Sequence, residues 1–166
     1  MYDVIFVPLK NDPDDGALLA HAARAAGVAP GASAAPGAPG GPAAPESRAG
    51  IPPAPRATLI LAHVVHSHAR DATTYLRADA EAYLEEVARP LAERGFDVQT
   101  LVVEGEPAEA IRGAAAESGA DLIVMGSHGH SQVRHFLLGS VTEAVIRGSE
   151  IPVLVVRPGP GNDGET

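Results

Sequence analysis

The chain has 166 residues, 45% of them hydrophobic, which predicts one domain with a core of its own over residues 1–158. Its formal net charge of -9 disfavours nucleic acids and anionic membrane surfaces as partners, and the lack of cysteine excludes disulfides, thiolate catalysis and cysteine-based zinc sites. The sequence has no signal-like segment and no apolar run of about 18 residues, so we expect a cytoplasmic protein that does not enter a membrane.

The chain opens with the apolar segment 4–7, a strand suited to burial on both faces at the centre of a sheet and ended by Pro8. Asp12 then offers a helix cap, with Pro13 in the first helical position. These residues predict a helix from about residue 13 to residue 26, with Gly27 as its stop signal.

Residues 28–57 consist mostly of alanine, proline and glycine. Such a segment lacks the large apolar side chains that would offset the entropy lost on ordering, so we predict a flexible insertion. A proline-rich ligand for a partner domain is the alternative, which the lack of a clean P-x-x-P motif disfavours, since Arg48 and Arg56 are the only basic residues among these prolines. We also expect a disordered tail over residues 159–166.

After this insertion, strands and helices continue to alternate. We predict a strand at 58–65 and a helix at about 72–94. The core-facing stripe of this helix is formed by residues three or four apart, namely Leu76, Ala80, Tyr83, Val87 and Leu91. The segment 96–103 begins by alternating apolar and polar residues, which indicates a strand at an edge of the sheet.

The last third of the chain predicts a helix at 106–119, a strand at 122–125, a helix at 141–147 and a strand at 152–156. The spacing of Ser140 and Glu143 is that of a capping box at the start of the third of these elements. The order βαβαβαβαβ predicts an α/β fold, an open, mostly parallel five-stranded sheet with helices on both faces.

A glycine-rich loop follows the predicted strand 122–125, where a doubly wound sheet places its ligands. Gly126 and Gly129 have no Cβ, so a polyphosphate can approach the backbone there. Gly139 and Ser140 then open a helix whose first N–H groups attract anions. Ordinary turn glycines are the alternative, but strand, glycine pair, spacer and helix start together favour a phosphate cradle.

These four residues fit the pattern G-x2-G-x9-G-[ST] without a gap, which resembles the nucleotide-binding signature of the universal stress protein family, UspA, in its ATP-binding type. The resemblance implies a Rossmann-like sheet of strand order 3-2-1-4-5 and a ligand cleft between the first and fourth strands. It also implies ATP as ligand, with or without Mg²⁺, and a role as a stress-response or signalling module. A homodimer through the last strand, Pro152–Val156, is implied as well.

The resemblance places the following residues at the nucleotide: Pro8, Lys10, Val64, Met125, Gly126, Ser127, His128, Gly129, His130, Ser131, Gly139, Ser140 and Val141. Lys10 departs from the family, which usually carries an aspartate there to hold the nucleoside. Its ammonium has two alternatives, pairing with a phosphate or with a neighbouring Asp12 or Asp14. Because of this charge reversal, an interaction protein of the same fold that does not bind nucleotide is the rival functional hypothesis.

Catalytic motifs are lacking: there is no Gly-x4-Gly-Lys-[Ser/Thr] loop, no Gly-x-Ser-x-Gly elbow and no carboxylate pair opposite the glycine loop. We therefore predict binding with at most weak ATP hydrolysis and no catalytic residue. The pairs His66/His68 and His128/His130 are interpreted as polar loop residues and not as metal ligands. His63, inside an apolar strand, is expected to pack with one hydrogen bond.

Overall fold

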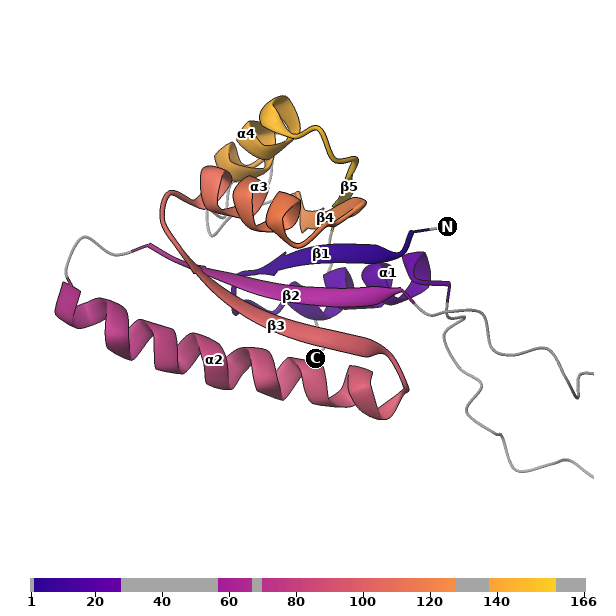
Figure 1. Ribbon diagram of the computed structural model, residues 1–166, viewed down its shortest axis with the longest axis horizontal. Helices are drawn as coiled ribbons and strands as arrows, with labels where there is room; N and C mark the ends of the chain where they lie inside the picture. The colour runs from indigo at the N-terminus through magenta and orange to yellow at the C-terminus, as the bar shows by residue number, and fades with distance from the viewer. Residues whose placement is uncertain (1, 28–56, 67–69, 128–137, 158–166) are drawn as a thin grey trace, which may run out of the picture.

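The computed structural model describes residues 2–27, 57–66, 70–127 and 138–157, and the side chains of 70–75 lie outside that description. Within these ranges five strands alternate with four helices (Figure 1). In chain order they are β1 (Val4–Leu9), α1 (Asp15–Ala25), β2 (Thr58–Val65), α2 (Arg70–Glu93), β3 (Asp97–Glu104), α3 (Pro107–Glu117), β4 (Leu122–Gly126), α4 (Ser140–Gly148) and β5 (Val153–Val156).

The sheet has the order β3-β2-β1-β4-β5, and every strand pair in it is parallel. The predicted α/β fold, its strand order and the edge position of the third strand are thus confirmed. The chain builds outward from β1 to β3, then returns to the other side of β1 for β4 and β5. The order therefore reverses between β1 and β4, and the carboxyl ends of these strands border the point where such sheets bind ligands.

Helices cover both faces of the sheet, with α1 and α2 on one face and α3 and α4 on the other (Figure 1). Two clusters of buried apolar side chains, one on each face, fill the space between the sheet and the helices. The one beneath α1 and α2 includes Leu18, Leu84 and Val124, while the one beneath α3 and α4 includes Ile111 and Val145. Among the described residues, no helix is both long enough and apolar enough to span a bilayer.

Two predicted boundaries near the N-terminus are wrong. Pro8 does not end the first strand, because β1 continues to Leu9 with Pro8 paired to Ala62. The first helix begins at Asp15 and not at Pro13, because Asp12 accepts a hydrogen bond from the backbone N–H of Asp14 at 2.7 Å and so closes a turn before the helix. The predicted stop holds, since Gly27 adopts a left-handed φ of 81° directly after the helix.

The predicted stripe of α2 is correct in phase but wrong at its first residue. Ala80 and Leu91 are buried, and Leu84, which the stripe omitted, is fully buried. Leu76 is 44% exposed. The first turns of α2 extend beyond the end of β2 (Figure 1), so this end of the helix has less of the sheet to pack against.

Candidate functional site

A cavity of about 670 Å³ opens at the carboxyl ends of β2, β1 and β4, beside the reversal of strand order. Its walls also include the starts of α3 and α4 and one residue of α2. The lining residues are Pro8, Leu9, Lys10, His63, Val64, Val65, His66, Leu76, Pro107, Ile111, Met125, Gly126, Gly139, Ser140, Val141 and Thr142.

Eight of the thirteen residues expected at the nucleotide line this cavity: Pro8, Lys10, Val64, Met125, Gly126, Gly139, Ser140 and Val141. Ser127 does not. It is 2% exposed, its N–H donates to the Val156 carbonyl at 2.9 Å, and its own carbonyl accepts from the N–H of Gly139 at 2.8 Å. Ser127 therefore supports the glycine end of the cavity through its backbone hydrogen bonds, without lining the cavity itself. His128, Gly129, His130 and Ser131 lie outside the described residues, as do His68 and the segment 28–56.

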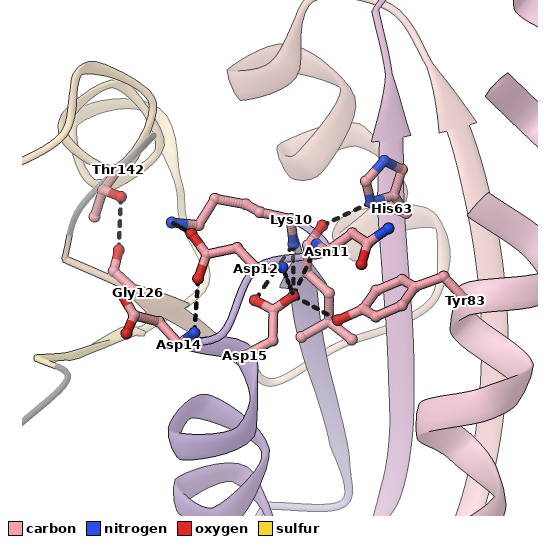
Figure 2. A network of polar contacts seen from close by, with 10 residues as sticks. Lys10, Asn11, Asp12, Asp14, Asp15, His63, Tyr83, Gly126 and Thr142 are labelled. Atoms are coloured by element: carbon pink, nitrogen blue, oxygen red, sulfur yellow. Dashed lines mark hydrogen bonds and ion pairs between the residues drawn. The ribbon is translucent and has the colours of Figure 1, made fainter. Parts of the chain in front are cut away.

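The phosphate-cradle end of the cavity is built by β4 and α4. Gly139 is the residue that precedes α4, and the N–H of Glu143 donates to its carbonyl at 2.9 Å. The predicted capping box does not form, because Ser140 is already helical and Glu143 pairs with Arg147 at 2.6 Å. Instead the Thr142 hydroxyl donates to the Gly126 carbonyl at 2.9 Å and ties the helix start to the strand end (Figure 2).

The opposite wall of the cavity is apolar. Val64 comes from β2, Leu76 from α2, and Pro107 and Ile111 from the first turns of α3. Arg77, next to Leu76, forms an exposed ion pair with Glu104 at the end of β3, with an N–O distance of 2.9 Å. The cavity therefore offers an apolar wall and a polar end, an arrangement that suits a ligand with a flat apolar group and a charged group.

Eight of the lining residues were not expected from the sequence, and three of them come from α2 and α3, namely Leu76, Pro107 and Ile111. These three residues belong neither to the glycine-rich loop nor to the end of a strand, so no sequence motif marks them. Thr142 was also missed, although it sits two residues after Ser140 in the predicted helix start. Its role depends on a contact sixteen residues back along the chain, which no local pattern encodes.

Lys10 enters the cavity from the turn after β1, and its Nζ lies 3.8 Å from Asp12 Oδ2. The turn is anchored by the buried Asp15, which is 3% exposed. Asp15 Oδ2 accepts the backbone N–H groups of Lys10, Asn11 and Asp12 at 3.1, 2.8 and 3.2 Å. It also accepts the hydroxyl of Tyr83 from α2 at 2.5 Å (Figure 2). One carboxylate thus holds the backbone of the whole turn.

Tyr83 and His63 complete this network. Burial, followed by the hydrogen bond to Asp15, raises the pKa of Tyr83 above the usual value for tyrosine, because both disfavour the phenolate. His63 Nδ1 donates to the Leu9 carbonyl at 3.0 Å, and its ring meets that of Tyr83 edge to face at 6.4 Å between centroids. The single hydrogen bond expected of His63 is present, and the residue also faces the cavity.

The described residues contain no group of three or more His, Asp or Glu side chains placed to hold a metal ion. His66, at the rim, contacts the Gly105 carbonyl through Nδ1 at 3.1 Å.

Comparison with known proteins decides the family. Residues 52–157 match the model of the universal stress protein family. The chain belongs to this family. Universal stress protein MJ0577 of Methanocaldococcus jannaschii is 44% identical over 82 residues, and universal stress protein YxiE of Bacillus subtilis is 43% identical over 74 residues. These alignments cover 49% and 45% of the chain, which spans about half the length of each relative, 51% and 50%.

Solved structures of universal stress proteins share the fold. The structure of MJ0577 superposes with a TM-score of 0.71 at 26% identity, covering 97% of this chain and 100% of the other. A universal stress protein in complex with cAMP has a TM-score of 0.65 at 24% identity, with 95% and 99% of the two chains covered.

Proposed function

We propose that this universal stress protein binds ATP in the cavity between β1 and β4 and acts as a stress-response or signalling module. The observation that carries the proposal is the convergence on one cavity of eight residues expected at the nucleotide. The phosphates would lie at Gly126 and Gly139, against the N–H groups that open α4. The base would lie against Val64 and the apolar wall.

Nucleotide occupancy would then control the conformation or the choice of partner. Among the described residues, the histidines that line the cavity, His63 and His66, each contact a backbone carbonyl through Nδ1, and the sequence carries no catalytic motif, so we propose binding with at most weak hydrolysis. Mg²⁺, if it takes part, would be held chiefly by the phosphates. The rival proposal, a protein–protein interaction module without nucleotide, rests on Lys10 in place of the family aspartate.

The nucleotide content of the purified protein tests the proposal against its rival. The chain has three tyrosines and no tryptophan, so a bound nucleotide would dominate its absorbance at 260 nm. We expect the purified protein to carry up to one nucleotide per chain. Acid should release this nucleotide, and mass spectrometry should identify it as ATP. Protein purified without nucleotide, and still unable to bind added ATP or cAMP, would support the interaction module instead.

A further inference from the structure

The turn that follows β1 has a strained backbone, and contacts of Asp15 and Tyr83 hold it in place. Asn11 has a left-handed φ of 62° and is the one residue other than glycine with positive φ in the described part of the chain. Such a conformation costs energy in any residue but glycine, although less in asparagine than in most, and the contacts around it offset that cost. Here the Asp15 carboxylate gathers three successive N–H groups, and Tyr83 binds the same oxygen from α2.

The strained turn decides the direction of Lys10. In Figure 2 the Lys10 side chain runs away from His63 and toward the side of the site where Gly126 and Thr142 lie. Lys10 is also the only lysine or arginine among the described residues that line the cavity. Its ammonium therefore approaches the proposed phosphate end and not the apolar wall.

We propose that Asp15 and Tyr83 are positioning residues that set Lys10 as a ligand for the polyphosphate of the nucleotide. This inference rests on the proposed function, and it assigns Lys10 a role opposite to that of the nucleoside-holding aspartate. The protein carries a net charge of -9, so a polyphosphate needs a local cation to bind. Asp12, 3.8 Å from Lys10 Nζ, holds the ammonium near the cavity, and the incoming phosphate competes with it.

The arrangement has a consequence for ligand choice. A triphosphate brings several negative charges to the ammonium, cAMP brings one, and adenosine brings none. Lys10 should therefore favour ATP over cAMP and have little effect on adenosine. Tyr83 and Asp15 should influence the same preference, and only through Lys10.

A double-mutant cycle tests this chain of action. Calorimetry would measure ATP, cAMP and adenosine affinities for the wild type, Lys10→Met, Tyr83→Phe and the double variant. Lys10→Met should lower ATP affinity about tenfold or more, as expected for a charge-assisted hydrogen bond. The same variant should lower cAMP affinity by a smaller factor.

Tyr83→Phe, which removes one hydroxyl, should lower ATP affinity about threefold and have no further effect when Lys10 is already Met. Tyr2→Phe is the matched control, because Tyr2 is 38% exposed and outside the network.

Two results would overturn the inference: an unchanged ATP affinity in Lys10→Met, or a loss from Tyr83→Phe that is the same with and without Lys10. A wild type that binds none of the three ligands would instead overturn the proposed function. Thermal unfolding of each variant identifies losses caused by misfolding. If Tyr83→Phe does not fold, Asp15→Asn, which keeps the shape of the side chain, takes its place in the cycle.

Discussion

Tyr83 connects α2 to the site through a single hydroxyl, and its position makes it sensitive to alkaline pH. The hydroxyl donates to a carboxylate, so the phenolate would face a negative charge in a half-buried place. The contact therefore exists only while the phenol is protonated. Residues such as Tyr83 and Asp15 show that the shape of this cavity depends on side chains that do not line it.

The raised pKa of Tyr83 predicts a loss of stability at high pH. Below about pH 10, tyrosine is protonated in both the folded and the unfolded chain. Above that pH the unfolded chain releases this proton while the folded protein retains it, so the free energy of unfolding should fall as pH rises. Denaturant unfolding between pH 8 and pH 11 measures this fall. The fall should be smaller in Tyr83→Phe, and an equal fall in both proteins would contradict the assigned contact.

At the scale of elements, helix α4 depends on its attachment to β4. Thr142 is 4% exposed, and its hydroxyl reaches the last carbonyl of the strand. Thr142→Val keeps the shape but leaves that carbonyl without this donor, so we expect a loss of about 1–2 kcal/mol in the free energy of unfolding. Thr100→Val, at an exposed position of β3, is the matched control and should change stability little. Equal effects in the two variants would contradict the role of Thr142.

The insertion between α1 and β2 gives a second prediction at this scale. Deleting residues 31–55 should leave the melting temperature nearly unchanged, because the cost of closing a loop depends only logarithmically on its length. Calorimetric melting of the two proteins provides the test. A fall of more than about 5 °C, which corresponds to roughly 1–2 kcal/mol in a domain of this size, would show that the insertion packs on the domain.

The order and type of the elements could be predicted because four strands are compact apolar runs, the third begins with alternating apolar and polar residues, and the helices carry an apolar stripe or start and stop signals. The second strand was predicted with its observed bounds, Thr58–Val65. The start of α1 could not be, because Asp12 and Asp14 are both acceptable residues to precede a helix. In the structure Asp14 precedes α1, while the carboxylates of Asp12 and Asp15 bind backbone N–H groups of the turn before it. Leu76 was misplaced because helical periodicity gives the phase of a stripe but not the length of sheet beneath it.

The candidate site was predictable where one motif encodes it. The pattern around Gly126, Gly139 and Ser140 pointed to the end of the sheet at which the cavity opens. The apolar wall from Leu76, Pro107 and Ile111 was not predictable, because these residues converge only when α2 and α3 pack against the same sheet. The buried contacts of Asp15 could likewise not be predicted, because an aspartate in the first turn of a helix is common and its partners include Tyr83, 68 residues along the chain.

At the scale of the whole molecule, β5 forms one edge of the sheet. In the described part of the chain it pairs with β4, and its other side faces outward. Leu154 is 40% exposed, Val153 and Val155 are half-buried, and Val156 is buried in the core beneath α1 and α2. An exposed apolar edge favours pairing with a second copy, and an antiparallel pairing about a two-fold axis closes on itself.

We therefore predict a homodimer through β5. Light scattering at micromolar concentration should give twice the chain mass of 16.9 kDa. Leu154→Lys should produce a monomer, because it places a charge at the interface without entering the core. Thr100→Lys on β3, the opposite edge strand, is the control and should remain a dimer. A wild-type monomer under these conditions would contradict the proposed assembly.

ATP calorimetry on a variant of a single glycine tests the proposed nucleotide cradle at the glycine end of the cavity. Gly139 has φ -60°, so valine fits its backbone while adding bulk at the place proposed for the phosphates. Gly113 in α3, around which nothing lies within 4 Å of an added Cβ, is the matched control. We predict that wild type and Gly113→Val bind ATP alike, whereas Gly139→Val binds about tenfold more weakly or not at all. Equal ATP affinity in Gly139→Val and the wild type would contradict the account.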